Sequence, residues 1–288
     1  IVRENVHKSP PVTDPVSMAH SFIYAIRRKF VGKPVKVWVD GVPNIEKQKA
    51  HDERASTRQK QLTVLDGMIS RISQFSDKAR WTPGSCVEKA DKLVGDLFIM
   101  DLDFRTKMVE VFKNEFPVEL CNGEADTAIA QDHLKQPTIT VDGRVLPRIA
   151  VSGDSDLLIY DSVKLLLRKM PKQDSFRLYR KKDVLAAMGF GSSTQLVLFG
   201  IISENDYTPH VKSFGFVTNL KIIHGMNDFH TSVEQLLQAY VDEVNTRLSK
   251  PSENIDISRF HASYKIFAKL DPTFSEDATP LSNNVYLD

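Results

Sequence analysis

The chain has 288 residues, of which 41% are hydrophobic and 26% charged, and its formal net charge is +1. This composition is ordinary for a soluble globular protein and allows one large α/β domain or a main domain with a helical annex. No stretch approaches the roughly 18 apolar residues needed to cross a bilayer, and the polar start shows no secretory signal. We therefore expect no membrane partner. Cys86 and Cys121 lack the partners of a zinc site, so we expect them to be reduced thiols. We expect an intracellular protein, nuclear in a eukaryote.

Charge is distributed unevenly along the chain. Residues 164–182 contain eight Lys or Arg and one acid, and residues 47–60 contain five basic residues and two acids. The segments 124–126 and 154–156 carry acidic side chains and no basic ones. Acidic clusters flanked by basic segments suit a metal-assisted reaction on a polyanion, whereas solvated surface faces are the ordinary alternative.

The predicted elements alternate between helices and strands. After an irregular segment 1–15, apolar residues at every fourth position predict a helix over 16–30, and the β-branched run 35–40 predicts a buried parallel strand. The next predictions, in chain order, are helices at about 44–64, 65–75 and 87–114, a strand at 117–122, a helix from Glu124 and a hairpin at 137–147. They are followed by a strand that runs into an acidic turn over 148–156, a second hairpin from 165–170 and 175–180, helices at 183–190, 194–203 and 232–248, and a polar tail with a short amphipathic piece at 264–267.

This alternation predicts a mostly parallel sheet, in which ligands bind at the carboxyl ends of the strands. Asp40, Asp154 and Asp156 stand at such ends, and Glu124 and Asp126 follow another. Each motif alone has an ordinary explanation, such as a turn or a helix-dipole partner. Together, carboxylates about 4 Å apart would repel by roughly 4 kcal/mol, so we expect a cation among them. Oxygen ligands favour Mg²⁺, Mn²⁺ or Ca²⁺ over zinc.

The order of the acidic motifs resembles that of the flap endonuclease family, which includes the Rad2/XPG-type 5′ nucleases of the PIN-like superfamily. The resemblance rests on VWVDG (37–41), GEAD (123–126), SGDSDLLIY (152–160) and FGIISENDY (199–207), and it covers roughly residues 16–225. It implies an α/β, PIN-like fold: a mostly parallel sheet flanked by helices, with a helical arch and a C-terminal helix–three-turn–helix region.

The resemblance also implies a domain organisation. Residues 1–160 would form the nuclease core with the helical arch at about 44–114, residues 161–250 the basic hairpin and DNA-binding region, and residues 251–288 a tail. We find no sliding-clamp-binding peptide in that tail.

The resemblance further implies a two-metal-ion site. Two Mg²⁺ ions, for which Mn²⁺ can substitute, would clamp both oxygens of a phosphodiester during in-line displacement. The implied ligands are Asp40, Glu124 and Asp126 for the first ion, and Asp154, Asp156 and Asp206 for the second.

Basic residues after the Asp-Gly motif match the family's phosphate contacts. Lys47 and Arg54 stand seven residues apart, which places them on one face of a helix. They would stabilise the charge of the transition state, although two ordinary exposed residues are the alternative. Arg58 and Lys60 are further candidates for backbone contacts. Residues 65–100 would form the arch or cap through which a single strand threads.

The chain departs from the family pattern near its start and around the second acidic motif. Only 39 residues precede Asp40, and they lack the family's first strand with its metal-binding Asp, which suggests a truncated chain. Asp14 lies among prolines and does not replace that residue. Asp126 stands where a Glu is usual, and the 137–147 hairpin lengthens the interval to Asp154.

A further departure concerns the helix–three-turn–helix region. The family's G-I-G-P-K becomes SFGFV at 213–217, with the loss of one Gly, the Pro and the Lys. Gly215, Lys212 and Lys221 could preserve some contact with the backbone of a duplex. These losses weigh against the K⁺ site that the resemblance would imply.

The preferred interpretation is a structure-selective, Mg²⁺-dependent nuclease acting on branched or flapped DNA. The missing first Asp and the altered glycine loop favour an alternative, a non-catalytic relative that binds nucleic acid. A PIN-like nuclease acting on RNA is the third hypothesis.

Overall fold

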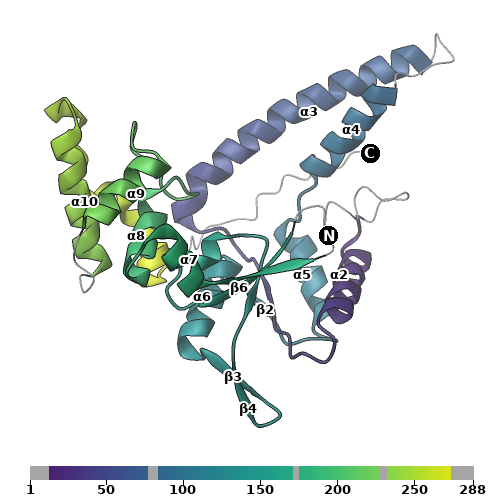
Figure 1. Cartoon of the computed structure of the whole chain (residues 1–288). Coiled ribbons are helices and arrows are strands. Elements are labelled where there is room, and N and C mark those ends of the chain that lie inside the picture. Colours follow the sequence, from purple (N-terminus) through teal and green to yellow (C-terminus); the bar gives the residue numbers. More distant parts are fainter. Residues whose placement is uncertain (1–12, 77–83, 171–174, 227–231, 274–288) are drawn as a thin grey trace. The chain divides into compact units, whose positions relative to one another are not determined.

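The computed structural model describes residues 13–76, 84–170, 175–226 and 232–273 (Figure 1). The first prolines, the break predicted at Pro83 and the end of the tail lie outside these ranges. The described residues divide into two compact units: residues 13–43, 48–76 and 84–125 belong to the first, and residues 44–47, 126–170, 175–226 and 232–273 belong to the second. The predicted boundaries at 160 and 250 stay a prediction.

The first unit contains a small parallel sheet and two packed helices. Strand β1 (Val37–Val39) pairs with β2 (Val118–Leu120). Helix α2 (Pro15–Lys29) begins at Asp14, whose carboxylate accepts a hydrogen bond from Ser17 N at 2.8 Å. Asp14 is therefore a helix cap. Helix α5 (Leu102–Phe112) packs against α2 around a core formed by Met18, Ala19, Ile23, Met108 and Phe112.

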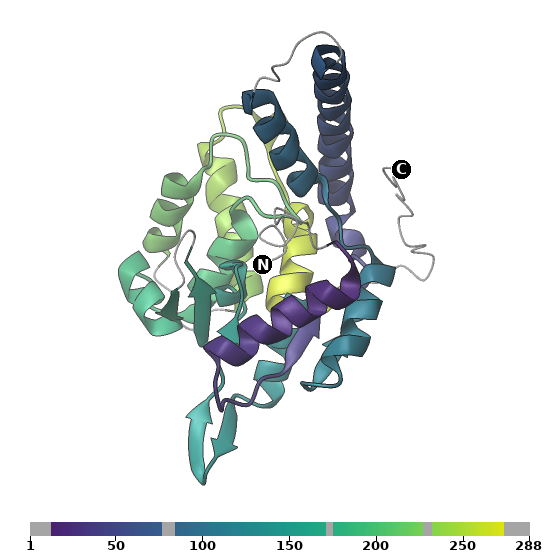
Figure 2. The ribbon, with the colours of Figure 1, turned by 90° about the vertical axis from the view of Figure 1, so that its right-hand side faces the viewer.

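Two long helices of the first unit correspond to the predicted arch. Helices α3 (Gln48–Ser76) and α4 (Gly84–Leu97) lie side by side (Figures 1 and 2). The segments predicted as separate helices, 44–64 and 65–75, form one helix after a 3₁₀ turn, η1 (Ile45–Lys47). At 1.5 Å per residue α3 is roughly 40 Å long. It is polar along most of its length, as expected of a helix with little core to cover.

The second unit contains both predicted hairpins. Strands β3 (Thr138–Val141) and β4 (Arg144–Pro147) are antiparallel, and Asp142 and Gly143 between them have φ of 51° and 73°. Two positive φ values are typical of a two-residue hairpin turn. Strand β6 (Leu165–Lys169) pairs with β7 (Phe176–Arg180) in the other hairpin and lies parallel to β5 (Ala150–Val151). Residues 148–156 were predicted as a strand that runs into an acidic turn, and β5 is the short strand of that segment.

Helices form the core of the second unit. They are α6 (Ala125–Lys135), α7 (Lys181–Met188), α8 (Ser193–Ile202), α9 (Phe216–Gly225), α10 (Val233–Arg247) and α11 (His261–Tyr264), with short turns η2 (Asp156–Leu158), η3 (Pro251–Glu253), η4 (Ile257–Phe260) and η5 (Lys265–Lys269). Residues 195–202 of α8 are all buried. No single helix in the described ranges is long and apolar enough to cross a membrane; α7 and α8 pass that test only as a pair, bent by 73°.

Candidate metal centre

The second acidic motif is a hydrogen-bonded turn that follows strand β5. The Asp154 amide donates to Ser152 Oγ at 3.0 Å, and Asp154 Oδ1 accepts from the Asp156 amide at 3.0 Å. Arg168 in β6 donates through Nε to Gly153 O at 2.9 Å. Because the turn is fixed by these bonds, Asp154 and Asp156 are held close to one another at the carboxyl end of the strand.

Asp206 lies in the loop after α8, in the same unit as Asp154 and Asp156. Asn205 fixes this loop: its side-chain amide donates to Gly200 O at 2.9 Å, and its Oδ1 accepts from Tyr207 N at 2.9 Å. Lys47 Nζ lies 2.8 Å from Asp206 Oδ2, and the Lys47 side chain is only 15% exposed. Lys47 therefore supplies a partly buried positive charge to Asp206 within the second unit.

Negative charge accumulates around Asp156. Burial and the neighbouring carboxylates of Asp154 and Asp206 together raise the pKa of Asp156 to about 6, against the opposing positive charges of Lys47 and Arg168. A carboxyl group with this pKa lies where negative charge is not fully compensated. Asp154, Asp156 and Asp206, which belong to the same unit, are therefore electrostatically coupled.

The first acidic motif is built by close backbone approach in the first unit. The Gly41 amide donates to Gly123 O at 2.8 Å, and a Cβ at Gly41 would lie 1.8 Å from Cys121 O. Only glycine fits here, which explains the Asp-Gly pair better than a simple turn does. Asp40 Oδ1 accepts from Ala125 N at 2.8 Å, so this carboxylate caps the first turn of α6.

Glu124 precedes α6 and Asp126 lies in its first turn, both half-buried. This position agrees with metal ligation and equally with complementing the helix dipole. The nearby Cys121 is a buried thiol, and Cys86 is also free of a disulfide, as expected. Burial and the charges of Glu119 and Asp40 raise the pKa of Cys121 to about 12, which makes its thiol unreactive at neutral pH.

The residues present fit a magnesium-type ion by their chemistry, since the coupled group offers only carboxylate oxygens. Within the described ranges, no three Asp, Glu, His or Cys side chains converge closely enough to hold an ion. Mg²⁺ commonly binds through one or two carboxylates, with waters and substrate phosphates as its other ligands. The charges of Asp154 and Asp206 thus act on Asp156. The two-ion ligand set stays a prediction.

The predicted nucleic-acid contacts lie on helices α3 and α9 and in the segments that precede them. Arg54 and Lys60 are exposed on α3 and Arg58 is half-buried, whereas Lys47 lies in the 3₁₀ turn before that helix. Gly215 precedes α9, Lys221 lies within it, and Lys212 is exposed in the loop before it, at residues 203–215. The contacts themselves stay a prediction.

The altered glycine loop retains part of the expected backbone geometry. Ser213 stands where the family has a glycine and has φ of 73°, a left-handed conformation that favours glycine. Gly215 is exposed, and a Cβ there would meet no atom within 4 Å.

Three supporting residues were not predicted. Asn205 and Arg168 hold the loops that carry Asp206 and Asp154, as described above. Arg105 in α5 donates to Asp40 O at 3.0 Å and to Gly41 O at 3.2 Å. Arg168 belonged to the basic run 164–182, but nothing in the sequence separates it from its neighbours there.

Comparison with known proteins supports the fold. A scan against protein-family models gave no match, and neither did a search of curated proteins. The catalytic core of Rad2 in complex with DNA substrate is similar, with a TM-score of 0.55, 13% identity, and coverage of 92% of this chain and 73% of that chain. The T5 D15 protein co-crystallized with metal ions gives a TM-score of 0.52, 14% identity, and coverage of 87% and 82%. The chain therefore has the α/β fold of the Rad2-type flap endonucleases, as its motifs predicted.

Proposed function

We propose that the chain is a metal-dependent nuclease that hydrolyses phosphodiester bonds in structured DNA, such as 5′ flaps or ends. The observation that carries this proposal is the charge-coupled group of Asp154, Asp156 and Asp206 with Lys47 beside it. The group follows a strand end, in a fold shared with a Rad2 core in complex with DNA and a T5 D15 protein co-crystallized with metal ions.

In this proposal the chain's own residues position charge. A divalent ion held by the carboxylates would polarise the phosphate and lower the pKa of a bound water. Lys47, already beside Asp206, would balance part of the negative charge of the phosphate. Arg168 and Asn205 would keep the acidic loops in place through the backbone bonds that they make.

The remaining assignments extend this proposal. Asp40, Glu124 and Asp126 are proposed for a first Mg²⁺ or Mn²⁺, and Asp154, Asp156 and Asp206 for a second. Arg54 is proposed to contact the scissile phosphate together with Lys47. The proposed contacts to the nucleic-acid backbone are Arg58, Lys60, Lys212, Gly215 and Lys221.

Cleavage of a 5′-flap DNA tests the proposal. We expect the protein to cut the flap with Mg²⁺ or Mn²⁺ but not with EDTA, and Asp156→Asn to slow cleavage by on the order of 100-fold or more. The matched control is Asp103→Asn, an exposed carboxylate on α5 that pairs with Lys107. Equal rates in both variants would refute a role for the coupled group. Matched RNA substrates distinguish the RNA-cleaving alternative.

A non-catalytic nucleic-acid-binding role is the second candidate, and two observations favour it. Asp40 and Asp154 each accept a hydrogen bond from a backbone amide, and Lys47 pairs with Asp206, so these groups have protein partners without an ion or a phosphate. A titration with Mn²⁺ separates the candidates. A nuclease should show a thermal shift with Mn²⁺ that Asp156→Asn removes, whereas a scaffold protein should show none and leave every flap uncut.

A further inference from the structure

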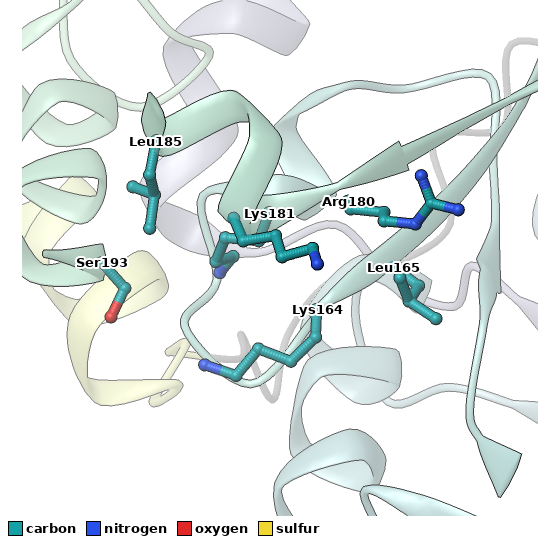
Figure 3. Close-up of a pocket in the computed structure, with 7 residues that line it drawn as sticks. Lys164, Leu165, Arg180, Lys181, Leu185 and Ser193 are labelled. Carbon is teal, nitrogen blue, oxygen red and sulfur yellow. The ribbon is translucent and has the colours of Figure 1, made fainter. Parts of the chain in front are cut away.

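A second cluster of charged residues in the second unit surrounds a hollow of about 340 Å³ (Figure 3). Lys164, Arg180, Lys181, Lys182 and Ser193 line it together with two leucines, and most of the surface that these residues turn to the hollow is apolar. The volume falls in the range of small-molecule sites in proteins. All of these residues lie in the region 161–250 that was predicted to bind DNA, but none belongs to the acidic group or to the individual contact residues named above.

The register of the β6–β7 hairpin creates this cluster. Leu165 in β6 stands opposite Arg180 in β7, and the Lys181 amide donates to Lys164 O at 2.9 Å. Basic residues that lie far apart in the sequence therefore become neighbours at one end of the hairpin. Ser193 is the first residue of α8, so the positive end of a ten-residue helix also faces this region.

Positive charge exceeds negative charge around the hollow. Lys164 Nζ lies 3.0 Å from Asp161 Oδ1, and Arg180 lies 3.5 Å from Asp183. Burial raises the pKa of Asp161, but its bond to Ser193 and the charges of Lys164 and Lys181 outweigh burial and lower that pKa. The lining thus contributes four basic residues, and these two carboxylates pair with Lys164 and Arg180.

The buried lysine strengthens this argument. Lys181 is 3% exposed, and its Nζ donates to Tyr160 O at 2.5 Å. Burial, opposed in part by the charge of Asp161 and assisted by that of Lys164, lowers the pKa of Lys181 to about 7. An anion beside this ammonium would compensate a charge that the protein itself leaves poorly compensated.

We propose that this hollow binds a phosphate group, either a backbone phosphate of a nucleic-acid strand or a free phosphate monoester. Lysine ammonium groups, a serine hydroxyl and a helix N-terminus are all donors to phosphate oxygens. Leu165 and Leu185 offer apolar contact to the sugar attached to the phosphate. The proposal needs no metal ion, so it stands apart from the proposed nuclease activity.

Binding measured in EDTA tests the proposal. The double variant Lys164→Gln/Lys182→Gln removes two exposed lysines of the hollow, and Lys107→Gln/Lys113→Gln removes two exposed lysines of α5 as a control with the same charge change. We expect the first to weaken binding of a short single-stranded oligonucleotide by about tenfold and to lower its salt slope by up to roughly 2. The control should change neither. Equal effects of both variants would overturn the proposal.

A variant of opposite sign gives an independent measurement. Asp161→Asn removes the carboxylate that competes for Lys164 and Ser193, so phosphate binding should tighten several-fold; unchanged or weaker binding would count against the site.

A 5′-mononucleotide and inorganic phosphate, titrated as competitors, distinguish a free phosphate monoester from a backbone phosphate as the ligand. Displacement of the oligonucleotide supports a free monoester, and retention supports a backbone phosphate. Asp103→Asn, which removes an exposed carboxylate of α5 with the same change of charge as Asp161→Asn, should leave all of these affinities unchanged.

Discussion

The acidic motifs of the two units differ in what surrounds their carboxylates. In the first unit, Asp40 is fixed by backbone contacts: Gly41 approaches Cys121, Arg105 binds two carbonyls, and the carboxylate caps α6. In the second unit, Asp156 lies in a field of charges formed by other side chains.

This difference shows which role each motif can perform without a ligand. A carboxylate that caps a helix has a structural function even when no ion is bound. A buried carboxyl group surrounded by other carboxylates costs stability unless a cation compensates it. The second group therefore points to a ligand more directly than the first.

The largest expected effect is that of Gly41→Ala. Its Cβ would collide with the backbone oxygen of Cys121, so we expect the free energy of unfolding to fall by about 3 kcal/mol or more. Gly153→Ala in the second unit is the matched control, because a Cβ there meets no atom within 4 Å. Urea unfolding measures both variants. Similar losses would show that backbone approach does not distinguish the two motifs.

Buried charge in the second unit should make stability depend on pH. The pKa of Lys181 is about 7 in the folded chain against an ordinary value of 10.5, so the wild type gains stability as pH rises between these values. Lys181→Met lacks this dependence. We expect the free energy of unfolding of this variant, relative to that of the wild type, to fall by on the order of 2 kcal/mol from pH 6.5 to pH 9.5, measured by urea unfolding. A constant difference, as expected for exposed Lys113→Met, would contradict this.

The pair of Lys47 and Asp206 should be coupled more strongly than a surface pair. A double-mutant cycle with Lys47→Gln and Asp206→Asn is expected to give about 1 to 2 kcal/mol in EDTA, because the lysine is mostly buried. The exposed pair of Lys113 and Glu110 on α5 should give about 0.3 to 0.5 kcal/mol in the same experiment. Coupling no larger than that of the surface pair would weaken the charge-based description of the second group.

The smallest expected effect concerns the altered glycine loop. Ser213 adopts a positive φ at a cost that glycine avoids, so Ser213→Gly should stabilise the chain by about 0.5 to 1 kcal/mol. Thermal unfolding measures the change. A loss of stability would mean that the Ser213 side chain contributes more than the strain costs. As a control, Gly143→Ser introduces a side chain at a φ of 73° and should destabilise the chain.

Much of the fold followed from local patterns. Alternation of apolar residues and the Asp142-Gly143 pair predicted the hairpin, and helical periodicity predicted α2, α8 and α10, because these patterns reflect burial and backbone geometry within a few residues. Residues 148–156 were predicted as a strand that runs into an acidic turn. Apolar patterning does not reveal that the strand covers only two residues, because Ser152 closes the turn directly after it.

The sequence alone determined the order of the acidic motifs and, through them, the fold. Only the tertiary structure decided how those motifs are held: that Gly41 must lack a side chain, that Lys47 pairs with Asp206, and that the hairpin register gathers a basic hollow at Lys181. Such contacts depend on how distant segments pack. A pattern along the chain reports the surroundings of each residue but not the identity of its neighbours in space.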